Sequence, residues 1–129
     1  MVKEFLVDEN IEEGAKLIYE LDQNNFRIDA ALWFYFTEAE EWRLIIATPI
    51  IDKKGPLSAY RKVIELIKKE KIFFYTPIRK LTILSPHDPL IKLLKIAIKT
   101  EPSSITRIRF QNNVINNVPI DDALIYRIQ

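Results

Sequence analysis

The stretch RIDAALWFYFTEAEEWRLIIAT, residues 27–48, decides the fold. Its first part, residues 28–36, alternates two sets of mostly apolar side chains, and the same pattern returns at residues 42–48 after the polar segment 37–40. A period of two residues is typical of β-strands, so the stretch predicts a β-hairpin. Because both strands carry apolar residues on both faces, we expect the hairpin to lie inside a sheet, covered at least partly on each side.

Helix signals stand before and after this hairpin. Asn10 is expected to cap a first helix, with Glu13 reaching back from the third helical position, and asparagines at residues 24–25 favour its end there. Proline is tolerated at the first position of a helix, so Pro56 and Pro89 each predict the start of another helix.

Further strands are predicted around Leu81 and Ile83, ending at Ser85, and at residues 105–110 and 123–128. The last two are expected to pair, and residues 112–122 to form a structured turn region. We therefore expect one α+β domain over residues 1–129. Its mixed sheet of about five strands consists of two β-hairpins joined by two helical crossovers around a central strand. About three helices are expected, packed mainly on one side of the sheet. The pattern leaves the strand order open.

Composition narrows the classes of function. The chain has no cysteine, which excludes disulfides, thiolate ligands and thiol nucleophiles. It has only two glycines, so no glycine-rich loop can hold a nucleotide phosphate, and we expect no cofactor. The longest apolar run, residues 30–36, is far shorter than a membrane span. The run at residues 5–7 is too short for a secretory signal, so we expect a cytoplasmic protein without a membrane contact.

The formal net charge of +1 conceals a strong asymmetry along the chain. Residues 1–52 carry four basic and twelve acidic side chains, a net charge of −8. Residues 53–109 carry fourteen basic and four acidic side chains, a net charge of +10. Two interpretations stay open: the two halves neutralise each other within the fold, which we favour, or they form a polar surface that binds a partner.

Residues suited to catalysis are few. A small hydrolase would have to use the only histidine, His87, together with Ser85 and Asp88. The same segment is also typical of a loop that leads into a helix capped by Asp88, which is the interpretation we favour. A single histidine makes a zinc site weak, and Asp29 and Glu41 fall at opposite ends of the expected hairpin, so no metal site is predicted.

Basic residues give one functional hypothesis. Lys92, Lys95 and Lys99 are expected to share one face of a helix, and Arg107 and Arg109 one face of a strand. Together with the other basic side chains of residues 61–109, they suggest contacts to the phosphates of a nucleic acid. Nucleic-acid binding is therefore the alternative function.

The leading hypothesis is a non-catalytic protein-interaction module that associates with itself as a homodimer or with another protein. Its expected contact surface is the non-core face of the hairpin, with Trp33, Tyr35, Arg43 and Ile45, because aromatic residues and arginine are enriched at interfaces. If helices covered one side of the sheet only, this face would need a partner. If a helix of the same chain covered it, it would not.

Overall fold

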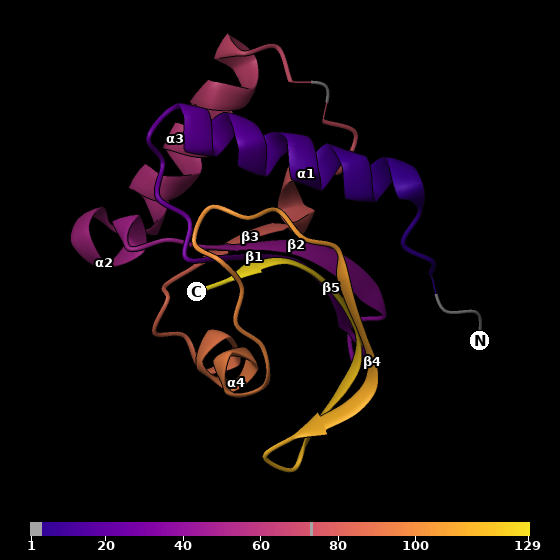
Figure 1. The fold of residues 1–129 in the computed structure, drawn as a ribbon. Coiled ribbons are helices and arrows are strands. Elements are labelled where there is room, and N and C mark those ends of the chain that lie inside the picture. The colour runs from indigo at the N-terminus through magenta and orange to yellow at the C-terminus, as the bar shows by residue number, and fades with distance from the viewer. Residues whose placement is uncertain (1–3, 73) are drawn as a thin grey trace.

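The computed structural model describes residues 4–72 and 74–129 as an α+β fold with one mixed, five-stranded sheet (Figure 1). In chain order, its elements are α1 (Asp8–Gln23), β1 (Ala30–Phe36), β2 (Glu41–Ala47), α2 (Ile50–Lys54), α3 (Pro56–Lys69), a 3₁₀ turn (Ile78–Lys80), β3 (Leu81–Leu84), α4 (Pro89–Ala97), β4 (Ile108–Ile115) and β5 (Val118–Ile128). The expected fold class is thereby confirmed.

The strand order of the sheet is β3-β2-β1-β5-β4. Strand β2 pairs with β3 in parallel, and the other three pairs are antiparallel. Strand β3, expected as the central strand, lies at an edge, and the centre is β1. This arrangement is reached because β1 pairs with β2 on one side and with the C-terminal strand β5 on the other.

The second hairpin is longer than the sequence pattern predicted. Strands β4 and β5 pair from Ile108 opposite Ile125 to Ile115 opposite Val118. The turn between them consists of Asn116 and Asn117, both with positive φ angles, of 47° and 66°. Two residues with positive φ give a turn whose twist matches that of the flanking strands, and asparagine tolerates this conformation. Most of the expected turn region is therefore strand.

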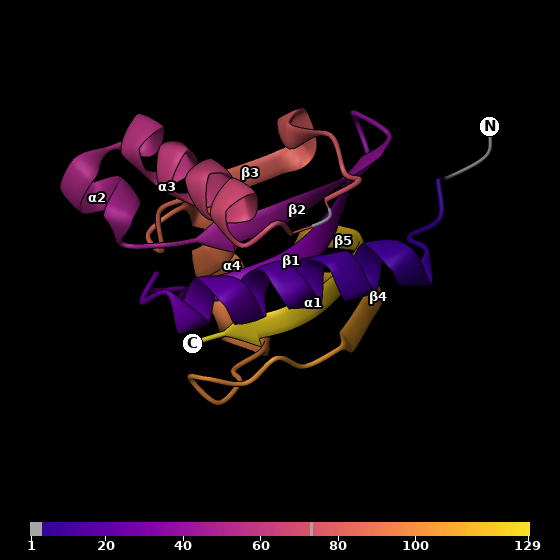
Figure 2. The same ribbon diagram turned by 90° about the horizontal axis from the view of Figure 1, so that it is seen from above.

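The two longest helices lie on one side of the sheet, and a shorter helix covers the other face (Figures 1 and 2). Helices α1 and α3 lie over one face, and α4 lies on the other, in the hollow of the curved sheet (Figures 1 and 2). Two separate clusters of buried residues result. The first joins Trp33, Leu44 and Ile46 to α1 and α3, and the second joins Leu32 and Ile45 to α4.

The helix ends follow the sequence signals with one exception. Helices α3 and α4 begin at Pro56 and Pro89, and the Asp88 carboxylate accepts a hydrogen bond from the amide of Leu90 at 3.0 Å. Helix α1, however, begins at Asp8, so Asn10 is not its N-cap. Asn10 is instead the third residue of the helix, and its side-chain oxygen accepts a hydrogen bond from the amide of Val7, the residue before the helix, at 3.4 Å.

Glu13 does not reach back to cap α1. Its side chain is buried, and its two carboxylate oxygens accept hydrogen bonds from the amides of Tyr75 and Thr76 at 2.7 and 3.0 Å. This carboxylate satisfies two donors of the irregular segment that precedes β3. Glu13 therefore ties α1 to a segment about sixty residues away in the chain.

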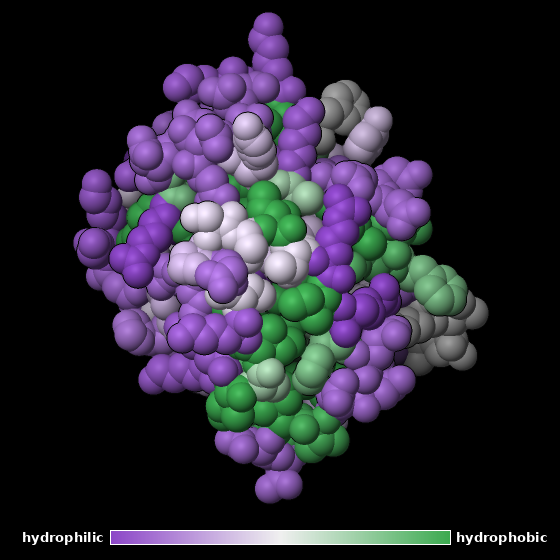
Figure 3. All heavy atoms as spheres, in the orientation of Figure 1, coloured by the Kyte–Doolittle hydropathy of each residue, from purple (hydrophilic) through white to green (hydrophobic). Residues whose placement is uncertain are grey.

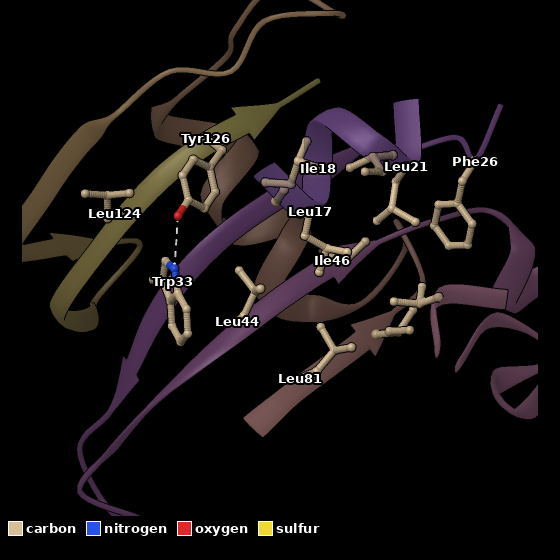
Figure 4. Close-up of a cluster of buried hydrophobic side chains, with 14 of the residues drawn as sticks. Leu17, Ile18, Leu21, Phe26, Trp33, Leu44, Ile46, Leu81, Leu124 and Tyr126 are labelled. Carbon is tan, nitrogen blue, oxygen red and sulfur yellow. Dashed lines mark hydrogen bonds between the residues drawn. The ribbon is translucent and has the colours of Figure 1, made fainter. Parts of the chain in front are cut away.

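A buried polar contact also fixes α1 against the sheet. The indole N–H of Trp33 donates to the hydroxyl of Tyr126 at 3.0 Å (Figure 4). That hydroxyl in turn donates to the carbonyl of Ile11 at 2.7 Å. Gly14 makes this approach possible, because a Cβ atom at its position would lie 2.4 Å from the tyrosine oxygen. Burial raises the pKa of Tyr126, so the hydroxyl keeps its proton for this contact.

Candidate functional site: a projecting hairpin arm

The four residues of the expected interaction face do not share a face of the sheet. Directly opposite partners in an antiparallel pair point to the same side. Because Trp33 pairs with Leu44, Trp33 and Tyr35 point toward α1, whereas Arg43 and Ile45 point toward the side of α4. This placement corrects the expected contact surface.

Three of these residues are also covered within the chain itself. Trp33, Tyr35 and Ile45 are buried, with 2%, 5% and 0% of their surfaces exposed. Arg43 is partly exposed and donates to the Glu41 carboxylate at 2.6 Å, and this hydrogen bond lowers the pKa of Glu41. Trp33 and Tyr35 thus belong to the core and offer no surface to a partner.

The two arginines expected to contact nucleic acid are both engaged by carboxylates. Arg109 binds both oxygens of Asp122, at 2.7 and 2.8 Å, and this hydrogen bonding raises the pKa of Arg109. Arg107 lies 2.6 Å from Glu12, and their hydrogen bond lowers the pKa of the carboxyl and raises that of the guanidinium. Neither arginine offers an uncompensated charge.

The exposed lysines of residues 92–99 and the basic residues of α3 lie on different faces of the sheet. Lys92 and Lys95 lie on α4, whereas Lys99 follows the end of that helix. The basic residues of 61–69 belong to α3, on the other side of the sheet (Figure 2). The fold therefore does not gather the basic residues of 61–109 into one surface.

Several ion pairs join the acidic half of the chain to the basic half. Besides Arg107 with Glu12, Lys80 lies 3.4 Å from Glu4, and Arg79 lies 3.4 Å from Glu41. These contacts support the interpretation that the two halves neutralise each other in part within the fold.

The residues considered for a hydrolase are arranged as a loop before a helix. The hydroxyl of Ser85 donates to Asp52 at 2.7 Å and accepts from the backbone amide of His87 at 3.0 Å, while Asp88 caps α4. The serine hydroxyl is thus directed to a carboxylate rather than to an imidazole. Within residues 4–72 and 74–129, no group of three or more acidic or histidine side chains is placed to hold a metal ion.

A polar depression of about 540 Å³ lies where α1 ends and β5 ends. Its best-buried charged group is Arg127, which binds both oxygens of Asp22, at 3.0 and 2.7 Å, and the carbonyl of Ser104. Since the guanidinium is already held by a carboxylate, this pair secures α1 to β5. We assign it a structural role.

The most distinctive surface feature is the outer part of the second hairpin. Strand β5 pairs with β1 only over residues 123–128, so its first five residues pair with β4 alone. We call residues 113–120, on either side of the turn, the hairpin arm. The arm projects beyond β1 and curves toward α4 (Figure 1). A two-stranded ribbon is marginal by itself in water, so the arm depends on what packs against it.

The two sides of the arm differ. Ile115 and Ile120 are buried in the cluster around α4, with 5% and 1% of their surfaces exposed. Val118 pairs with Ile115 and points to the same side, but near the turn it is 44% exposed. Val114 and its partner Pro119 point to the other side, where Val114 is 66% exposed. Residues 34–39, Leu90 and residues 118–121 line an apolar groove of about 460 Å³ beside the arm. Hydrophobic residues gather over this part of the molecule in Figure 3.

The sheet edges are protected unequally. At the β3 edge, the amide of Ile83 donates to the hydroxyl of Tyr60 at 2.9 Å, and the strand has only four residues. In the arm, the side of β5 that faces away from β4 carries Pro119. Proline lacks the N–H group that another strand would need there, so it protects this side from pairing. The outer edge of β4, eight residues long, pairs with no strand in the part of the chain that is described. Exposed edges are ready templates for pairing with another chain.

The arm also has no charged side chain. Residues 110–120, FQNNVINNVPI, contain no charged residue, and no other charge-free run in the chain is as long. Sequence reasoning missed this surface because it treated residues 112–122 as a turn. The signal was present in the Asn116–Asn117 pair flanked by β-branched residues, which is typical of a two-residue hairpin.

In comparisons with known proteins, no family model, no curated protein and no solved structure matches the chain. Among the described residues, no helix is both long enough and apolar enough to span a membrane.

Proposed function

We propose that this chain is a cytoplasmic, non-catalytic protein-interaction module and that the hairpin arm is its contact surface. The observation that carries the proposal is the outer edge of β4, which pairs with no described strand, together with the exposed Val114 in that strand. Interface cores are depleted in charged residues, and the arm has none. The proposal keeps the function expected from the sequence and moves its location from the first hairpin to the second.

The open edge of β4 and the apolar groove beside it support the proposal, because both can gain contacts from a bound segment. An open edge presents backbone N–H and C=O groups that another strand can satisfy, which is the basis of recognition by strand addition. The neighbouring apolar groove, lined by Leu90 and Pro119 among others, offers a pocket for side chains of a bound segment. Backbone pairing supplies affinity in this mode, and the groove supplies selectivity.

Site-specific photo-crosslinking in the native host tests the proposal. A photoreactive phenylalanine analogue replaces Val114, and a matched variant carries it at Leu57, which is 69% exposed on α3 across the sheet. We expect a discrete protein adduct from the Val114 position and none from the Leu57 position. Adducts of equal abundance at both positions, or none at either, would refute the arm as a contact surface.

Nucleic-acid binding is the alternative, supported by the exposure of Lys92, Lys95 and Lys99. It predicts binding of a labelled oligonucleotide that weakens steeply with salt, because phosphate contacts release counterions. Reversal of the three lysines to glutamate should reduce the slope of that salt dependence. Absence of binding at low salt would remove this alternative.

A further inference from the structure

We propose that the partner of the hairpin arm is a second copy of this chain, bound through a two-fold axis that passes near Val114. This inference rests on the proposed function and names its partner. Closed two-fold dimers are the commonest assemblies of soluble proteins, and in them the same surface patch meets itself.

The absence of charged side chains from the arm favours a second copy as its partner. Near a two-fold axis every side chain approaches its own equivalent, so any charge there meets a like charge and is repelled. Because residues 110–120 carry no charge, two arms can meet without such repulsion. The nearest arginine, Arg109, is held by both oxygens of Asp122 and adds little net charge beside the arm.

The chemistry of the arm is also complementary to itself. Asn113, Asn116 and Asn117 are exposed amides that both donate and accept hydrogen bonds. Val114, the most exposed apolar residue of the arm, would be buried against its equivalent. Segments that combine β-branched and amide side chains with low charge are the type that pairs with identical segments.

The outer edge of β4 limits how the arms pair. Asn112 has a φ angle of 49°, and the side-chain amide of Asn113 donates to the carbonyl of Gln111 at 2.9 Å. The positive φ angle interrupts the regular extended backbone of β4 between its first four residues and the arm, although the register to β5 stays the same on both sides. Contact between two copies is therefore confined to the arm and does not extend along the whole of β4, so it closes as a dimer.

Analytical ultracentrifugation across the micromolar range tests this inference. Wild type is expected to approach twice the 15.2 kDa of one chain. Val114→Lys should weaken the dimer by at least about tenfold, because it places two like charges at the axis. The matched variant Leu57→Lys, at an exposed position across the sheet, should leave the dimer unchanged. Far-ultraviolet circular dichroism would check that both variants are folded.

The natural absence of cysteine allows an independent readout. Val114→Cys is expected to form a disulfide-linked dimer much faster than Leu57→Cys under the same mild oxidation, since only the first thiol lies near the axis. A wild type that stays monomeric throughout the concentration range, with equal oxidation of the two variants, would overturn the second copy as partner. If photo-crosslinking at Val114 still captured a different protein, the proposed function would survive; if it captured nothing, both would fail.

Discussion

The face of the sheet beneath α1 and the hairpin arm are held in contrasting ways. Beneath α1, buried polar groups have specific partners: Trp33 with Tyr126, Glu13 with two backbone amides, and Arg127 with Asp22. The arm has no charged side chain, pairs with one neighbouring strand only, and is secured mainly by Ile115 and Ile120 on its inner side.

The difference separates residues that specify the fold from residues left for a partner. A buried polar contact is costly when one member is removed, because the other member loses its hydrogen bond away from water. An exposed apolar side chain contributes little to the folded monomer. Substitutions beneath α1 should therefore change stability, and substitutions on the outside of the arm should change association.

Trp33→Ala gives the largest expected effect. Trp33 is buried, packs in the cluster beneath α1, and donates to Tyr126, so its truncation leaves a cavity and removes one of the two hydrogen bonds of the tyrosine hydroxyl. We expect a loss of about 3–5 kcal/mol in the free energy of unfolding, measured by urea denaturation. The matched substitution Tyr19→Ala, at a residue 49% exposed on α1, should cost less than about 1 kcal/mol.

An effect of Trp33→Ala on association alone, without loss of stability, would restore the first hairpin as the contact surface. Such a result would mean that a side chain only 2% exposed in the folded chain contributes to association rather than to stability.

Gly14→Ala should give the next effect. The new Cβ atom would lie 2.4 Å from the hydroxyl of Tyr126 and 3.0 Å from the indole nitrogen of Trp33, so α1 or the tyrosine has to move. Overpacking of this kind costs about 1–3 kcal/mol, which exceeds the gain of roughly 0.5–1 kcal/mol from replacing a helical glycine. Thermal and urea denaturation both measure the net loss.

A double-mutant cycle with Tyr126→Phe separates crowding from other effects. Removing the hydroxyl loses its bonds to Trp33 and Ile11, but it also removes the atom closest to the new Cβ. The double variant should therefore be more stable than the sum of the single losses implies. Strict additivity would show that the close approach of α1 to Tyr126 is not what requires glycine at position 14.

The central hairpin and the helix starts could be predicted because their signals are local. Alternation at residues 28–36, and prolines at positions 56 and 89, report directly on strand period and on allowed helix positions. The structure confirms β1, β2 and the first residues of α3 and α4. Local signals of this kind need no knowledge of neighbouring strands.

The contact surface could not be predicted because it depends on register and strand order. Trp33 and Arg43 point to opposite faces only because Trp33 pairs with Leu44, a fact that the pattern of either strand alone does not contain. Glu13 likewise matched a capping box, yet it binds amides about sixty residues away. The hydrogen bonds to this distant segment, rather than the local capping pattern, determine where the Glu13 side chain lies.

The smallest expected effect on stability belongs to the outside of the arm. Val114→Ser should change the free energy of unfolding of the monomer by less than about 0.5 kcal/mol, because the side chain is 66% exposed. Ile120→Ser, on the buried side of the same arm, should cost several times more, since it exchanges a side chain only 1% exposed for a polar one. Denaturation at a protein concentration low enough to keep the chain monomeric measures both. Equal losses would mean that the outer side of the arm supports the fold, and Val114 would then be no free surface for a partner.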